Sequence, residues 1–126
     1  MKRTIFLSLL LFLSAFANAQ GDTKQIAQDV DVATFKQLMA EYNNEILLDV
    51  RTQNEVDSGA IKGAQHIDYF ADDFKKQLAK LDKSKTVLVY CAAGGRSGEA
   101  MSIMKGMGFE EVYNLLGGYG AWTAEE

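Results

Sequence analysis

The chain has 126 residues but only one cysteine, Cys91. A disulfide within the chain is therefore excluded. Cys91 is a buried inert thiol, the partner in an intermolecular disulfide, or a reactive group. The glycines, the arginine and the expected helix start that follow it favour a reactive group.

Basic residues are also fewer than acidic ones, since the chain has 13 Lys and Arg and 17 Asp and Glu. Two of the basic residues, Lys2 and Arg3, belong to a segment that we expect to be removed, which leaves a net charge of −6. Binding to nucleic acid needs a basic face that contacts the phosphates. The sequence therefore argues against nucleic acid as a partner.

The chain lacks an apolar run long enough to cross a bilayer. The run from Ile5 to Phe16 has about twelve residues, whereas a spanning helix needs about 20. It follows a basic start, Met1-Lys2-Arg3, and leads into Ala17-Asn18-Ala19, which has the form of a secretory cleavage site. We predict a signal peptide over residues 1–19. The mature protein, from Gln20, is then periplasmic or secreted and not stably inserted in a membrane.

The rest of the chain alternates between strand-like and helix-like segments, with no proline and no internal repeat. Apolar and β-branched runs predict strands near Asp29–Val32 and at Glu45–Val50, Gln65–Asp68, Thr86–Tyr90 and Glu111–Leu115. Helical spacing predicts helices at Thr34–Tyr42, Asp72–Leu81, Ser97–Met107 and after Gly117, with one helical turn at Glu55–Ser58. This order is typical of an α/β fold with a parallel sheet and helices on both faces. Residues 20–29 are predicted to be a polar leader and residues 30–126 one domain.

Cys91 comes directly after one of these strands and before the loop Ala92-Ala93-Gly94-Gly95-Arg96. Ser97 is expected to cap the helix that follows. The thiol thus lies at the carboxyl end of a strand and just before a helix N-terminus, where α/β sheets bind ligands and anions are stabilised. The helix dipole, the loop N–H groups and Arg96 are expected to lower the pKa of Cys91 and to favour its thiolate.

Three polar residues outside the loop are expected to support the structure. A preformed thiolate needs no general base, so we expect the only histidine, His66, to belong to the scaffold. Asp49 ends a buried strand, where a carboxylate needs hydrogen bonds or a cation. Arg51 is the nearest cation, and a salt bridge to Asp49 is favoured over a contact with substrate.

A thiolate surrounded by N–H groups suits an anionic substrate, and two reactions meet that description. Attack on a sulfane sulfur, such as that of thiosulfate, leaves a persulfide on Cys91. Attack on a phosphate ester leaves a phosphocysteine.

Three motifs resemble those of the single-domain rhodaneses, a family of thiosulfate sulfurtransferases. The loop from Cys91 to Ser97 is similar to the family's C-x-x-G-x-R-S. Its D-V-R-x-x-x-E-[FY]-x-x-G-H-I-x-G-A pattern resembles Asp49-Val50-Arg51 with Glu55, Gly59, Ile61, Gly63, Ala64 and Ile67. Its G-G-[YFI]-x-x-W ending resembles Gly117-Gly118-Tyr119 with Trp122. The chain departs from the pattern at Val56 and Ala60, where the family often has an aromatic residue and a histidine.

The resemblance implies a rhodanese-like fold with a central five-stranded parallel sheet. It also implies that Cys91 accepts the sulfur and that Arg96 borders the pocket. The residues expected to hold the transferred group through their backbone amides are Ala92, Ala93, Gly94, Gly95, Arg96 and Ser97. Phosphatases that share this fold resemble C-x5-R, a longer loop, whereas Cys91 to Arg96 is C-x4-R, so sulfur transfer is favoured. No cofactor and no metal ion is expected.

The sequence therefore predicts an exported sulfurtransferase that works through a Cys91 persulfide. Its partners would be a small sulfur-anion donor and a thiophilic acceptor, either cyanide or a thiol, with a protein acceptor as a further possibility. The alternative is a sulfur-carrier or protein-binding module with little turnover. A thiol oxidoreductase is disfavoured because there is no second, resolving cysteine.

Overall fold

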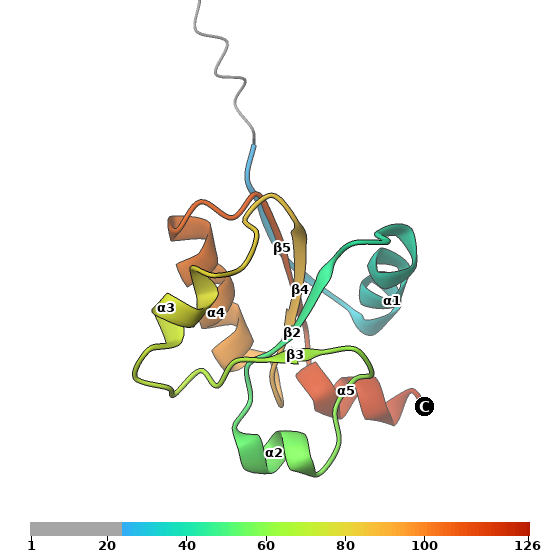
Figure 1. The fold of residues 1–126 in the computed structure, drawn as a ribbon. Coiled ribbons are helices and arrows are strands. Elements are labelled where there is room, and N and C mark those ends of the chain that lie inside the picture. The colour runs from blue at the N-terminus through green and yellow to red at the C-terminus, as the bar shows by residue number, and fades with distance from the viewer. Residues whose placement is uncertain (1–23) are drawn as a thin grey trace, which may run out of the picture.

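The computed structural model describes residues 24–126 (Figure 1). The predicted signal peptide and the first residues of the predicted leader lie outside the described residues. Within that range the strands are β1 (Ile26–Val30), β2 (Ile46–Asp49), β3 (Gln65–His66), β4 (Thr86–Tyr90) and β5 (Glu111–Leu115). The helices are α1 (Val32–Glu41), α2 (Gln53–Asp57), α3 (Phe74–Leu78), α4 (Gly95–Gly106) and α5 (Gly118–Ala124). None of these helices is long and apolar enough to cross a membrane.

The strands form one sheet in the order β1-β5-β4-β2-β3, and every neighbouring pair is parallel. This confirms the predicted five-stranded parallel sheet. The central strand is β4, and its last residue, Tyr90, is in register with Asp49 at the end of β2. Because parallel strands end at the same edge, Asp49 and Cys91 lie at one end of the sheet.

Helices cover both faces of the sheet, as predicted. In Figure 1 α3 and α4 lie on one side and α1 on the other. All five residues of β4 are buried, and the four from Val87 to Tyr90 alternate between two apolar clusters. Val87 and Val89 pack with α3 and α4, whereas Leu88 and Tyr90 pack with α1 and α5. Burial on both faces explains why β4 is an unbroken apolar run, since each large side chain gains about 1.5–3 kcal/mol from leaving water.

Two expected boundaries at the start of the domain are corrected by the structure. The first strand runs from Ile26 to Val30, so it begins within the residues assigned to the leader. It is an edge strand with exposed polar positions, which hides its strand character in the sequence.

The first helix is capped by Asp31, whose side chain accepts a hydrogen bond from Thr34 N at 2.8 Å. The helix was expected to begin at Thr34, but it begins at Val32 because Asp31, three positions before Thr34, caps it.

Ser97 is not a helix cap. Helix α4 begins earlier, with Gly94 as its N-cap, and Ser97 lies buried within the first turn. The expected helix over Asp72–Leu81 is shorter, because only Phe74–Leu78 is helical and turns follow. The expected strand over Gln65–Asp68 is reduced to two residues at the edge of the sheet.

Candidate active site

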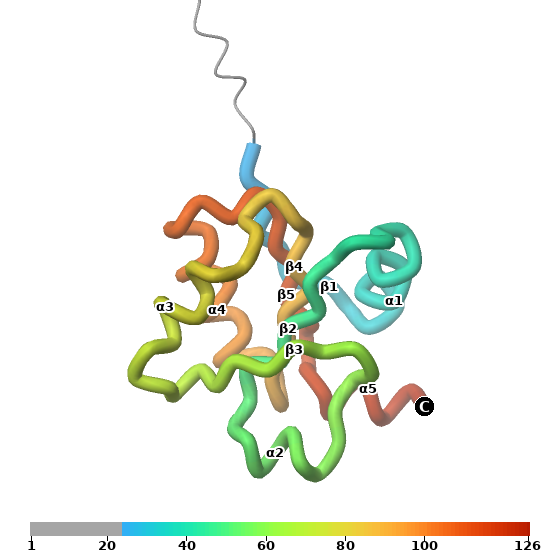
Figure 2. Tube along the Cα trace, viewed as in Figure 1, coloured from blue at the N-terminus to red at the C-terminus, as the bar shows by residue number. Residues whose placement is uncertain are grey.

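The Cys91 loop lies at the carboxyl end of β4, between the starts of α4 and α5. Figure 2 shows α2 beyond this same end of the sheet. Gly94 gives the loop its curl with a φ of 104°, a left-handed conformation that favours glycine. A Cβ there would lie 3.4 Å from Leu115 O, which is an ordinary van der Waals distance. The glycine is therefore favoured by the backbone conformation and not by lack of space.

The Cys91 thiol is almost fully buried, with 1% of the residue exposed. Its Sγ receives hydrogen bonds from Gly94 N at 3.1 Å and from Ser97 Oγ at 3.2 Å. Burial alone raises the pKa of a thiol, but hydrogen bonds from the Ser97 hydroxyl and from loop N–H groups outweigh it, so the pKa of Cys91 is lowered. The lowered pKa was expected from the sequence, whereas the hydroxyl of Ser97 was not expected to contribute.

The first turn of α5 holds the loop from its other side. Tyr119 N donates to Cys91 O at 2.8 Å, and Gly120 N donates to Ala92 O at 3.1 Å. These two bonds fix the Cys91 and Ala92 carbonyls toward α5. A Cβ at Gly118 would collide with Cys91 O and with the Ala92 backbone. The second glycine of the Gly117-Gly118 pair thus has a role at the site that sequence analysis missed.

Arg96 does not point freely into the pocket, because it forms an ion pair with Glu55. Its Nη1 and Nη2 lie 2.8 Å and 2.9 Å from the two carboxylate oxygens. The hydrogen bonds from Arg96 lower the pKa of Glu55 to about 2. The guanidinium carbon also lies 5.8 Å from the centre of the exposed Phe70 ring. The charge of Arg96 is therefore balanced before any substrate binds.

Glu55 is positioned by its own helix, α2. It forms a capping box with Thr52, in which the Thr52 side chain accepts from Glu55 N and Glu55 Oε1 accepts from Thr52 N. In the sequence, Glu55 is a motif position and the first residue of a predicted helical turn. The spacing T-x-x-E before a short helical turn was the available signal, but it does not reveal the arginine that the carboxylate meets.

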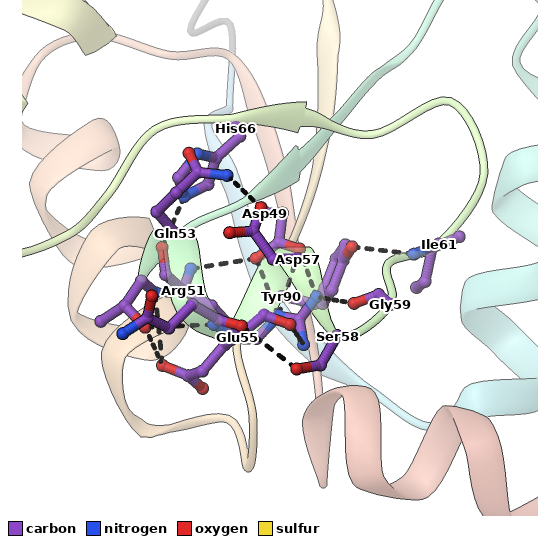
Figure 3. Close-up of polar contacts among 12 residues, drawn as sticks. Asp49, Arg51, Gln53, Glu55, Asp57, Ser58, Gly59, Ile61, His66 and Tyr90 are labelled. Carbon is purple, nitrogen blue, oxygen red and sulfur yellow. Dashed lines mark hydrogen bonds and ion pairs between the residues drawn. The ribbon is translucent and has the colours of Figure 1, made fainter.

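Asp49 and Arg51 form a buried ion pair that supports α2 (Figure 3). Arg51 Nη2 lies 2.7 Å from Asp49 Oδ2 and 2.7 Å from Gly59 O. The guanidinium also stacks 4.3 Å from the Tyr119 ring centre and 5.5 Å from that of Tyr90. The pair fixes both ends of the α2 segment to the sheet. The expected salt bridge between Asp49 and Arg51 is thus present. The remaining contacts of the Arg51 guanidinium hold the α2 segment, which carries Glu55.

His66 lies on β3, away from the sulfur. Its Nε2 is 2.6 Å from Arg51 O. A carbonyl oxygen only accepts, so Nε2 carries a proton and donates it to this bond. The ring therefore ties β3 to the segment after β2, which agrees with the expected scaffold role. Among residues 24–126 there is also no group of three His, Cys, Asp or Glu side chains arranged to hold a metal ion.

A sequence profile described as the Rhodanese-like domain matches residues 31–125. The chain belongs to the rhodanese-like domain family. The fold agrees, because a crystal structure of a rhodanese-like domain protein from Staphylococcus aureus superposes with a TM-score of 0.67 at 26% identity. That superposition covers 75% of this chain and 90% of the other.

Several relatives of this rhodanese-like domain are named as sulfurtransferases. It is 28% identical over 98 residues to a sulfurtransferase of Allochromatium vinosum, which covers 78% of this chain and 90% of the relative. It is 35% identical over 79 residues to the thiosulfate sulfurtransferase GlpE of Coxiella burnetii, covering 63% and 72%. The tRNA uridine(34) hydroxylase of Cytophaga hutchinsonii is 36% identical over 99 residues, but the match covers 76% of this chain and only 31% of that protein. The family assignment therefore supports a domain of the sulfurtransferase type.

Proposed function

We propose that this rhodanese-like domain is a thiosulfate sulfurtransferase that carries sulfur as a Cys91 persulfide. The observation that carries the proposal is the position of Cys91 Sγ, which accepts hydrogen bonds from Gly94 N and Ser97 Oγ inside a C-x4-R loop. These donors stabilise a sulfur anion. They stabilise the Cys91 thiolate both when it attacks the donor and when it is released from the persulfide.

The reaction has two displacements at one sulfur atom. In the first, the Cys91 thiolate attacks the sulfane sulfur of thiosulfate, a new S–S bond forms, the S–S bond of the donor breaks, and sulfite leaves with the electron pair. In the second, cyanide or a thiolate attacks the outer sulfur of the persulfide and Cys91 leaves as the thiolate. Electrons balance across the two steps, so no separate oxidant or reductant is required.

The loop N–H groups are the donors best placed to bind the anionic substrate. Arg96 is paired with Glu55, so the pocket offers hydrogen bonds more than it offers net positive charge. Ala92 and Ala93 have small side chains, and Ala93 is exposed. Small side chains here place little bulk between solvent and the buried sulfur, which suits a small donor such as thiosulfate.

A steady-state assay with thiosulfate and cyanide tests the activity. The mature protein is expected to form thiocyanate, and Cys91→Ser is expected to form none. Absence of thiocyanate from a folded protein would contradict the enzyme proposal. A protein that takes up sulfur but does not pass it to cyanide would instead support the alternative, a carrier that delivers sulfur to a protein thiol.

Two observations favour a protein acceptor as this second candidate. Phe70 and Leu116 are large apolar side chains that are mostly exposed, and they flank the Cys91 loop. Phe70 lies beside Arg96, and Leu116 Cα lies 3.9 Å from the position of a Cβ on Gly94. An acceptor protein that presents a thiol next to apolar residues would cover both.

We also propose that the protein is exported and works in the periplasm or outside the cell. The proposal is supported by the basic start, the short apolar run and the Ala17-Asn18-Ala19 site. N-terminal sequencing of the protein from the periplasmic fraction tests it, with Gln20 expected as the first residue. Retention of Met1 in a cytoplasmic protein would contradict it.

A further inference from the structure

Asn114 is a polar residue in the buried part of β5, with only 2% of its surface exposed. Within the sheet it stands between Asp29 of β1 and Val89 of β4. Asn114 takes no part in the two displacement steps of the proposed sulfur transfer. A buried amide is unfavourable unless hydrogen bonds compensate for lost water, so its partners should show why it is there.

The amide nitrogen of Asn114 makes two hydrogen bonds. Nδ2 donates to Asp29 Oδ1 at 2.9 Å and to Gly94 O at 3.2 Å. A carboxylate and a carbonyl both accept, so the NH₂ group must face them and the orientation of the amide is fixed. Its oxygen, Oδ1, then has no hydrogen-bond partner among residues 24–126. The two bonds from nitrogen thus hold the side chain in place although its oxygen remains unpaired.

One of these bonds reaches the residue that donates to the sulfur. Gly94 has its N–H 3.1 Å from Cys91 Sγ and its carbonyl bonded to Asn114. Glycine rotates more freely than any other residue, so an N–H donor on glycine needs an external anchor. Helix α4 supplies one anchor, because Gly98 N donates to the Gly94 carbonyl at 3.0 Å. Asn114 supplies the second, from the sheet.

The neighbouring helix leaves room for this contact. A Cβ on Gly98 would lie 3.4 Å from Asn114 Nδ2, which is an ordinary van der Waals distance. The amide of Asn114 thus lies close to Gly98 where it reaches the Gly94 carbonyl. The arrangement therefore joins β5, the start of α4 and the sulfur through two consecutive hydrogen bonds.

We propose that Asn114 is a positioning residue that directs the Gly94 N–H at the Cys91 sulfur by holding the Gly94 carbonyl. Its benefit to catalysis rests on the sulfurtransferase function proposed above. Its effect on the thiolate does not depend on that function, because formation of the Cys91 thiolate can be measured without a sulfur donor. The two proposals can therefore fail separately.

The test is the pH profile of Cys91 alkylation by iodoacetamide in the mature protein. Asn114→Ala removes the amide, and Asn114→Thr removes it while keeping a similar volume and a residue that favours strands. In both variants the midpoint should move to higher pH, and the rate below the midpoint should fall about threefold. Asp29→Ala is the matched control, because it removes the other acceptor and leaves the Gly94 bond. Its profile should not change.

A second readout uses the unmodified protein and needs no variant to fold. In ¹H–¹⁵N spectra the Gly94 amide and the Asn114 side-chain NH₂ should both shift as Cys91 ionises. An Asn114 signal that stays fixed through this transition would overturn the proposal. So would folded Asn114 variants with an unchanged alkylation profile, since that result would leave only a structural role. A shifted profile without any sulfur transfer would uphold the positioning role and reject the proposed activity.

Discussion

Two arginine–carboxylate pairs lie at the carboxyl end of the sheet, and they differ in exposure. The side chains of Arg51 and Asp49 are 4% and 1% exposed, whereas those of Arg96 and Glu55 are 22% and 32% exposed. A buried pair that loses one partner leaves an uncompensated charge, whereas water can solvate the halves of an exposed pair. The first pair is therefore suited to hold the fold and the second to respond to a substrate.

Helix α2 connects the two pairs. Arg51 binds the Gly59 carbonyl just beyond this helix, and Glu55 lies within it. The buried pair thus sets the position of the carboxylate in the exposed pair. The buried pair is thus a structural contact, whereas the exposed pair lies next to the Cys91 sulfur.

Breaking the buried pair should have the largest effect on stability. Asp49→Ala leaves the Arg51 guanidinium buried without its partner, so the free energy of unfolding should fall by about 3–5 kcal/mol. Urea denaturation measures the change. Asp57→Ala, at an exposed carboxylate of α2 that bonds only to Gln53, is the control and should change it by less than about 1 kcal/mol. Similar losses for the two variants would show that the buried pair is no more important for stability than an exposed carboxylate.

Removing a donor from the sulfur should act on reactivity instead. Ser97→Ala deletes the hydroxyl that contributes most to lowering the pKa of Cys91. The pKa should rise toward its ordinary value, leaving less thiolate at neutral pH and slowing alkylation about tenfold. Ser102→Ala, in the same helix but exposed, is the control. An unchanged alkylation rate in Ser97→Ala would show that the hydroxyl does not stabilise the thiolate.

Neutralising the carboxylate of the exposed pair should change substrate binding more than stability. In Glu55→Gln the charge of Arg96 is no longer balanced, so KM for thiosulfate should fall about threefold at low salt. The gain should shrink as salt is added, and the free energy of unfolding should change by less than about 1 kcal/mol. Glu99→Gln has the same change in net charge without touching Arg96. An equal effect in both variants would mean that the pairing itself is unimportant.

Acid should leave the exposed pair intact over most of the accessible range. The pKa of Glu55, about 2, lies below its ordinary value of 4.5. Its contribution to stability is therefore complete above pH 4.5 and disappears only as the pH falls through about 2. Titration of the Glu55 carboxyl carbon by NMR measures this. A midpoint near 4.5 would mean that the pair does not persist in solution.

The central part of the fold could be predicted because its signals are local. A strand buried on both faces is a continuous apolar run, which located β4, and the residues after it located the Cys91 loop. The first strand was placed too late because an edge strand with polar positions lacks such a run. Single-sequence patterns therefore identified the centre of the sheet better than its edges.

The contacts that tune the site could not be predicted because they join distant residues. Glu55 and Arg96 are 41 positions apart, and Asn114 reaches Gly94 across 20. Ser97 was misassigned for a related reason. Local rules make it a helix cap, but a glycine in a left-handed conformation begins the helix and the hydroxyl turns to the sulfur.

Intact mass spectrometry after incubation with thiosulfate tests the central claim most directly. The account predicts that the mature protein gains the mass of one sulfur atom, that peptide mapping places it on Cys91, and that cyanide removes it. Cys91→Ser should gain nothing. A folded protein that gains no sulfur, or a Cys91→Ser variant that gains as much, would contradict the account.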